Sequence, residues 1–170
     1  DRVILDFLHA RVATALTAVF EVITVSGSAS VLVPAVFVAT VALWYRKHRR
    51  EAILLTASAL TGAGLVYIVK RLVGRARPEL WPSEWYSGSS FPSGHTLAVA
   101  ATATAGALVL IRLWPAARRW AISVAFLWTV LVALSRLVLG VHWPTDVLAA
   151  ACIGAAIPLV LSLGFAFSRS

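Results

Sequence analysis

Long apolar segments with few charges are the feature that most constrains this chain. They occupy residues 30–45, 51–72, 96–113, 120–139 and 147–167. The second covers roughly 33 Å at about 1.5 Å per residue, enough to cross a hydrocarbon core of about 30 Å. Unpaired backbone groups find no water inside a bilayer, so each segment is expected to be a helix. Because 60% of the residues are hydrophobic and 13% charged, we predict an all-α, polytopic membrane helix bundle with five visible spans.

The N-terminal residues 1–25 differ from these segments because they carry ionisable side chains at intervals along an apolar helical pattern. The ionisable residues are Asp6, His9, Arg11 and Glu21. Burying four such groups in lipid is costly, so we expect an interfacial helix at the membrane surface, with a tilted span as the alternative. No polar linker separates the apolar segments, and residues 1–170 are predicted to form a single domain.

Basic residues at the ends of the apolar segments predict the orientation. The clusters at residues 46–50 and 112–119 are rich in arginine, and the positive-inside rule assigns such turns to the cytoplasm. The formal net charge of +8 agrees with contact to anionic lipid head groups and to an anionic substrate. Nucleic acid is not an expected partner, because the basic residues do not follow one polar face with interleaved aromatics.

A third basic cluster lies at the opposite, non-cytoplasmic end and breaks this charge rule. It contains Lys70, Arg71, Arg75 and Arg77, followed by Pro78. Clustered cations are suited to binding a multiply charged phosphate. In a continuing helix Lys70 and Arg77 would share a face, whereas Pro78 favours an extended conformation that lifts Arg77 off the helix. Arg71 and Arg75 are expected only to extend to the membrane interface.

The loop before the central turn contains Trp81, Trp85 and Tyr86, which are expected to belong to an aromatic belt at the membrane surface. The polar turn of residues 92–95 then leads directly into the apolar run that starts at Thr96.

This turn has the composition of an anion site. A helix start presents unpaired N–H groups and partial positive charge. Ser93 can cap the helix and donate its hydroxyl, Gly94 lets the backbone approach an oxyanion, and His95 can move a proton near neutral pH. Taken alone, such a turn is more often a capped helix start, but the basic clusters at the same end favour function.

The segment 135–146 places Arg136, His142 and Asp146 at that same outer end. Asp146 lies four residues after His142, so its carboxylate can bind one ring nitrogen and leave the other free to attack phosphorus. Pro144 fits a first-turn position in the helix that carries Asp146. The three clusters together predict a phosphate site with two imidazoles.

Three motifs occur in order: K-x6-R-P at residues 70–78, P-S-G-H at 92–95 and S-R-x5-H-x3-D at 135–146. On these motifs the chain resembles the type 2 phosphatidic acid phosphatase family, in particular its bacterial membrane members. Members of that kind usually have six spans with both termini in the cytoplasm. A first span is therefore expected to precede Asp1, and the absence of an initiator Met agrees with this.

The resemblance implies a role for each residue of the motifs. Its phosphate-binding residues would be Lys70, Arg77, Ser93, Gly94 and Arg136. His142 would be the nucleophile, Asp146 would orient it, and His95 would protonate the leaving group. Three fixed cations already oppose the charge of the transition state, so neither a metal nor another cofactor is expected.

The predicted function is therefore a metal-independent phosphatase for a lipid phosphate or diphosphate, acting through a phosphohistidine. It would lie in the bacterial inner membrane with its site facing the periplasm. Polyprenyl diphosphate, phosphatidylglycerophosphate and phosphatidic acid are the candidate substrates.

Other functions are compatible with parts of this pattern. A lipid-linked phosphotransferase would use the same phosphohistidine and stays open as the alternative. A non-catalytic lipid carrier would not need His142 and Asp146 beside three cations. Soluble vanadium-dependent haloperoxidases share the phosphate site, but five spans argue against that activity.

Overall fold

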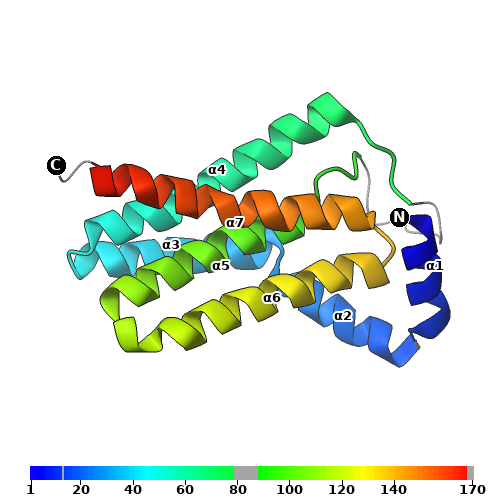
Figure 1. Cartoon of the computed structure of the whole chain (residues 1–170), viewed down its shortest axis with the longest axis horizontal. Helices are drawn as coiled ribbons and strands as arrows, with labels where there is room; N and C mark the ends of the chain where they lie inside the picture. The colour runs from blue at the N-terminus through cyan, green and yellow to red at the C-terminus, as the bar shows by residue number, and fades with distance from the viewer. Residues whose placement is uncertain (13, 79–87, 168–170) are drawn as a thin grey trace.

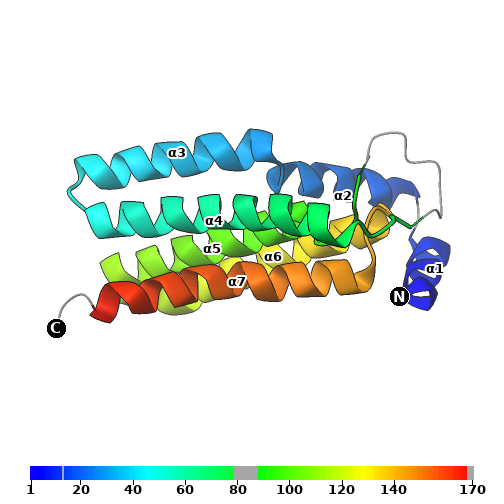
Figure 2. The same cartoon turned by 90° about the horizontal axis from the view of Figure 1, so that it is seen from above.

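The computed structural model describes residues 1–12, 14–78 and 88–167, and the regular secondary structure within them is helical. The elements are α1 (Arg2–Arg11), α2 (Thr14–Ser26), α3 (Ala29–Tyr45), α4 (Arg49–Val73), α5 (Gly94–Leu113), the 3-10 turn η1 (Pro115–Ala117), α6 (Arg118–Val138) and α7 (Pro144–Phe167). Helices α3 to α7 run roughly along the long axis of the molecule, whereas α1 lies across one end (Figures 1 and 2). Trp81, Trp85 and Tyr86, the expected aromatic belt, lie outside the described residues.

The predicted membrane bundle is confirmed. Within the described residues, five helical stretches are long and apolar enough to cross a membrane. They are Leu16–Tyr45, Arg49–Val73, Gly94–Leu113, Pro115–Val138 and Pro144–Gly164. The chain is therefore a multi-pass membrane protein, and Pro144 is the first residue of its helix as predicted.

The N-terminal region differs from the single interfacial helix predicted for residues 1–25. The backbone at Val12 is extended and ends α1, and α2 then begins a new direction toward α3 (Figure 1). The reason is length: α3 has 17 residues, which cover only about 26 Å of a core of about 30 Å. The apolar α2 completes the first span, and α1, which carries Asp6 and Arg11, stays outside it.

The core lies around α5, which packs against α4, α6 and α7. Small residues allow these helices to approach closely. A Cβ atom on Gly154 of α7 would lie 2.6 Å from the carbonyl oxygen of Leu97 and 2.7 Å from the Cβ of Ala100, both in α5. This close contact packs the middle of α7 against the first two turns of α5.

The two ends of the bundle differ in the connections that they carry. The α3–α4 and α5–α6 turns, with their arginines, lie at the same end as the C-terminus (Figure 1). The end of α4, the start of α5 and the α6–α7 turn lie toward the opposite end, which we refer to as the site end. The three motif segments are thus separated in space from both of the basic turns predicted to be cytoplasmic.

Candidate active site

The end of α4 separates Lys70 from Arg77. Gly74 ends the helix with a left-handed backbone at φ 60°, a conformation that glycine adopts without steric cost. The chain therefore leaves the helix before Arg77, and the two cations do not share a helix face. Lys70 instead donates from Nζ to the carbonyl oxygen of Ser89 at 2.9 Å, which directs its ammonium toward the segment leading into α5.

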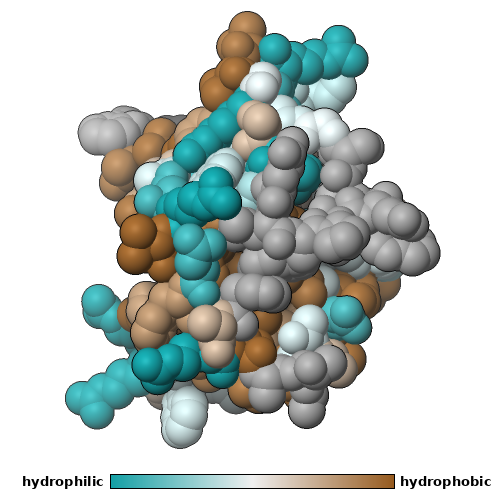
Figure 3. All heavy atoms as spheres, turned by 90° about the vertical axis from the view of Figure 1, so that its right-hand side faces the viewer, coloured by the Kyte–Doolittle hydropathy of each residue, from teal (hydrophilic) through white to brown (hydrophobic). Residues whose placement is uncertain are grey.

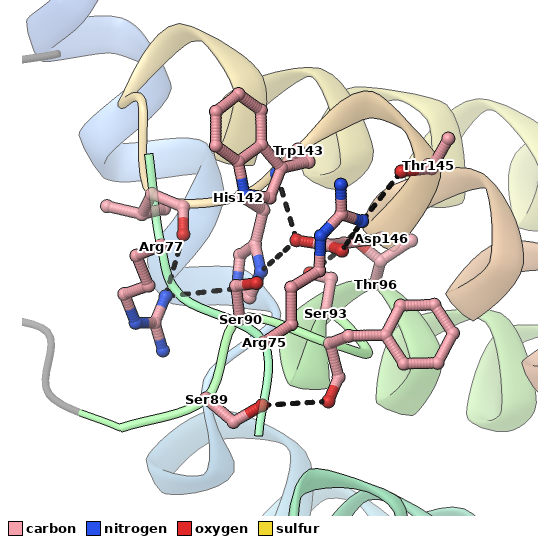
Figure 4. Close-up of polar contacts among 12 residues, drawn as sticks. Arg75, Arg77, Ser89, Ser90, Ser93, Thr96, His142, Trp143, Thr145 and Asp146 are labelled. Atoms are coloured by element: carbon pink, nitrogen blue, oxygen red, sulfur yellow. Dashed lines mark hydrogen bonds and ion pairs between the residues drawn. The ribbon is translucent and has the colours of Figure 1, made fainter. Parts of the chain in front are cut away.

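His142 occupies the centre of the site, in the turn between α6 and α7. Its Nε2 lies 3.5 Å from Nη1 of Arg77, and its Nδ1 lies 3.6 Å from Oδ2 of Asp146. The imidazole therefore lies between a guanidinium and a carboxylate (Figure 4). The contact with Asp146 is slightly long for a hydrogen bond, as is common in catalytic sites without substrate. One ring nitrogen faces the carboxylate and the other faces a cation suited to phosphate.

The protonation state of His142 follows from its burial. The side chain is 2% exposed, and burial is the main reason that its pKa is lowered from 6.5 to about 4. The charges of Arg136 and Arg77 lower the pKa further, whereas Asp146 opposes the shift. His142 is therefore neutral near pH 7, and Asp146 faces a neutral imidazole that keeps the lone pair needed for attack.

Two buried or half-buried arginines are held in place by specific acceptors. Arg77 donates to the carbonyl oxygens of Val141 at 2.7 Å and Gly88 at 3.1 Å. Arg136, which is 1% exposed, donates from Nη1 to the Thr24 hydroxyl at 2.6 Å. The α2 helix, which the sequence had assigned to the surface, thus supports a predicted phosphate-binding residue.

The start of α5 is joined to the start of α7. Ser93 occupies the N-cap position and its N–H donates to the carbonyl oxygen of Asp146 at 3.4 Å. The predicted side-chain cap is not formed, because the buried hydroxyl of Ser93 pairs with that of Thr96 at 3.0 Å instead. Gly94 and His95 form the first turn of α5.

All of the predicted site residues meet at the site end. The side chains of Arg136, His142, Lys70 and Arg77 lie close enough to His95 to act on it electrostatically. Hydrophilic side chains also gather on the outer surface of this end (Figure 3). Among the described residues, no three His, Cys, Asp or Glu side chains come together in the way that metal ligands do.

One charged residue of the site was missed from the sequence. Arg75 was expected only to extend to the interface, but its Nη1 donates to Oδ1 of the buried Asp146 at 2.6 Å (Figure 4). Arg71, by contrast, is exposed and its guanidinium lies 4.5 Å from the ring centre of Tyr67. The spacing of Arg71 and Arg75 along the chain could not predict that Arg75 contacts Asp146 while Arg71 stays exposed, because the contact of Arg75 depends on the turn at Gly74.

An apolar cavity of about 460 Å³ lies between α3, α4 and α5. Gly94 and His95 line the part of it nearest the site. Phe37 of α3 and Leu60 of α4 also line it and are 67% and 68% exposed. The cavity therefore extends from His95 to the lateral surface of the bundle, where lipid would surround it.

Comparison with known proteins agrees with this architecture. The model of the PAP2 superfamily matches residues 50–169. Phosphatidylglycerophosphatase B of Escherichia coli is 39% identical over 85 residues, which are 49% of this chain and 32% of that protein. The enzyme of the same name from Bacillus subtilis is 30% identical over 135 residues, covering 78% of this chain and 66% of that protein. The chain thus spans from about a third to about two thirds of these relatives.

A solved structure extends the likeness to almost the whole chain. The crystal structure of a transmembrane PAP2-type phosphatidylglycerolphosphate phosphatase from Bacillus subtilis superposes with a TM-score of 0.87 and 28% sequence identity. The superposition covers 99% of this chain and 85% of the other. Since the family model includes every helix from α4 onward and a PAP2 phosphatase shares the arrangement of nearly the entire bundle, this protein belongs to the PAP2 superfamily.

Proposed function

We propose that this protein is an integral membrane phosphatase that hydrolyses a lipid phosphate or diphosphate through a phosphohistidine on His142. The observation that carries the proposal is the position of the imidazole of His142 between Arg77 and Asp146. The names of the similar proteins, which are phosphatases of a phospholipid, support the same reaction class. We further propose that the site faces the periplasm of a bacterial inner membrane.

The first step forms the phosphoenzyme. Nε2 of His142 attacks phosphorus while the bond from phosphorus to the leaving oxygen breaks. Lys70, Arg77 and Arg136 oppose the charge on the transferring phosphoryl group, which is the main catalytic need in phosphoryl transfer. Nδ1–H of His142 faces Asp146, so the carboxylate stabilises the positive charge that the ring gains.

His95 serves the leaving group in this scheme. The negative charge of a bound phosphate favours its protonated form, which then donates a proton to the departing alkoxide or phosphate. In the second step a water molecule gives a proton to His95 and attacks phosphorus. The Nε2–P bond breaks, inorganic phosphate leaves, and His142 returns to its neutral form.

The apolar cavity supports a lipid as the substrate. It begins at His95, the proposed proton donor to the leaving group. The hydrocarbon tail attached to the leaving group would therefore enter the cavity. Its walls are apolar and reach the lateral surface at Phe37 and Leu60. A hydrocarbon tail can therefore remain in the cavity while the phosphate lies among the three cations.

Filling this cavity is expected to slow hydrolysis of lipid substrates much more than hydrolysis of small soluble substrates. Ala63→Phe places a ring in the lining of the cavity and should lower kcat/KM for a long-chain lipid phosphate by about tenfold or more, since each buried methylene contributes about 0.8 kcal/mol. Hydrolysis of a small aryl phosphate should change little. Ala156→Phe, at an exposed position of α7, is the control. Equal losses on both substrates would show that the cavity does not hold the tail.

The orientation is tested by labelling cysteines on intact bacterial cells with a membrane-impermeant thiol reagent. In a Cys152→Ser background, Arg71→Cys at the site end should be labelled, whereas Ala116→Cys at the opposite end should react only after the cells are opened. Both positions are exposed, so access depends on the side of the membrane. The reverse pattern would place the site in the cytoplasm.

The reaction class is tested by offering the purified protein polyprenyl diphosphate, phosphatidylglycerophosphate and phosphatidic acid, each without an acceptor alcohol. Release of free inorganic phosphate from at least one of them is the expected result. A protein that releases none, but transfers phosphate to an added lipid alcohol, would be a phosphotransferase that uses the same site.

A further inference from the structure

Arg75 lies outside the motif positions, yet it makes three polar side-chain contacts at the site end. Nη1 donates to Asp146 Oδ1 at 2.6 Å and to the Thr145 hydroxyl at 2.8 Å, and Nη2 donates to Asp1 Oδ2 at 2.8 Å. The guanidinium thus bridges two carboxylates. A cation that only extended to the membrane interface would not need these partners.

The two oxygens of Asp146 have different partners. Oδ1 accepts from Arg75, whereas Oδ2 accepts from the backbone N–H of Trp143 at 2.9 Å and faces Nδ1 of His142 at 3.6 Å. Rotation about the last side-chain bond of an aspartate has a broad, roughly two-fold distribution of angles. A carboxylate with a partner on one oxygen only can therefore rotate. Contacts on both oxygens hold Oδ2 toward His142, as Figure 4 shows.

Arg75 is itself held in position by the surrounding backbone. Its carbonyl oxygen accepts from the N–H of Ser90 at 2.8 Å. The next carbonyl, that of Ala76, accepts from the Ser90 hydroxyl at 3.0 Å and from Nε1 of Trp143 at 2.9 Å. The guanidinium also lies 5.5 Å from the ring centre of Trp143. The segment after α4 is therefore fixed against the α6–α7 turn.

A buried carboxylate also needs a partner of opposite charge. Asp146 is 0% exposed, and an uncompensated charge there would be costly. His142 compensates this charge little, because burial holds its pKa low. Arg75 supplies the charge from the side of Asp146 that does not face the imidazole.

On these contacts, and resting on the proposed phosphohistidine mechanism, we propose that Arg75 is a positioning residue of the reaction. It holds Asp146 so that Oδ2 receives Nδ1–H of His142 as the Nε2–P bond forms. It does not bind the phosphate. Loss of Arg75 should therefore slow the chemical step and leave phosphate affinity unchanged.

The test compares Arg75→Gln and Arg75→Lys with the control Arg71→Gln, which removes the same charge from the same end of the bundle. Phosphoenzyme formation from an aryl phosphate is measured in a single turnover, and inorganic phosphate is used as a competitive inhibitor. Arg75→Gln should slow phosphoenzyme formation by about 10- to 100-fold, the scale of a misplaced catalytic group, with an inhibition constant within about twofold of the wild type. Arg75→Lys, which keeps the charge but not the planar fork, should recover part of the rate.

A double-mutant cycle with Asp146→Asn tests whether Arg75 acts through Asp146. In that background Arg75→Gln should slow the reaction by less than about threefold. An equal loss in both backgrounds would overturn the proposal, as would a wild-type rate for Arg75→Gln or weaker inhibition by phosphate. Should Arg75→Gln not fold, a wild-type rate for Arg75→Lys would overturn it and a slowed rate with unchanged inhibition would support it. The proposed function fails separately, if His142→Ala still forms the phosphoenzyme.

Discussion

Replacing His142 by alanine is expected to abolish the phosphoenzyme and to lower turnover by roughly 10⁴-fold or more, as removal of a nucleophile does. His142 is the imidazole whose Nδ1 faces a buried carboxylate and whose Nε2 faces Arg77. Replacing His95 by alanine should lower turnover of an alkyl phosphate by about 10²- to 10⁴-fold, the usual contribution of a general acid. An aryl phosphate needs little protonation of its leaving group, so its first step should be partly spared.

Acid quench after mixing with a radiolabelled phosphate ester distinguishes the two roles, because a phosphohistidine is labile in acid and stable in base. The wild type and His95→Ala should both form this adduct from the aryl phosphate, and His142→Ala should not. His48→Ala, in the α3–α4 turn at the opposite end, is the matched control and should behave as the wild type. If His142→Ala forms the adduct and His95→Ala does not, the two roles are exchanged.

Replacing Arg77 by glutamine should lower kcat/KM by about 10³-fold, since one of the cations that oppose the transition-state charge is lost. The pH dependence should change as well. The charge of Arg77 disfavours a second positive charge on His142 and so lowers its pKa. Without Arg77 the pKa of His142 rises above about 4. The nucleophile is then protonated at a higher pH, and the acidic limb of the kcat/KM profile shifts to higher pH.

Profiles of kcat/KM between pH 4 and 8, with an aryl phosphate, measure this displacement. The wild type should stay near its plateau down to about pH 5, because its free His142 has a pKa of about 4. Arg71→Gln, which loses a charge from an exposed position, should keep the wild-type limb. A limb that does not move in Arg77→Gln would mean that another group controls the acidic side of the profile.

The order of the apolar segments was sufficient to predict which motifs meet. Successive spans cross in opposite directions, so the end of the helix that carries Lys70 lies at the same side as the start of the helix that follows Ser93. The same alternation returns the chain to that side at Arg136 and His142. The short spacing of His142 and Asp146 likewise keeps them close, although His142 lies in the turn before α7 and not in the helix that carries Asp146. The common side of the three motifs therefore depends only on helix length and direction.

The sequence did not predict that α2 completes the first span, nor which residues of α6 contact α2. The ionisable residues of the first 25 positions made a surface helix reasonable, but a separate helix, α1, takes Asp6 and Arg11 away from the span. Thr24 and Ser26 of α2 then meet Arg136 and Trp128 of α6, at 2.6 and 2.9 Å. Such pairs join residues more than a hundred positions apart. No local pattern of the sequence specifies them.

The amino-acid sequence by itself therefore determined the class of fold, the number of spans and the common side of the motifs, because these follow from apolar length and from the alternating direction of membrane helices. The tertiary structure decided which of two similar arginines reaches Asp146. The turn at Gly74 carries Arg75 out of the helix and against the α6–α7 turn, while Arg71 stays on the exposed face of α4. The difference arises from a single left-handed residue and from packing between distant segments, and neither is visible in the spacing of charges along the chain.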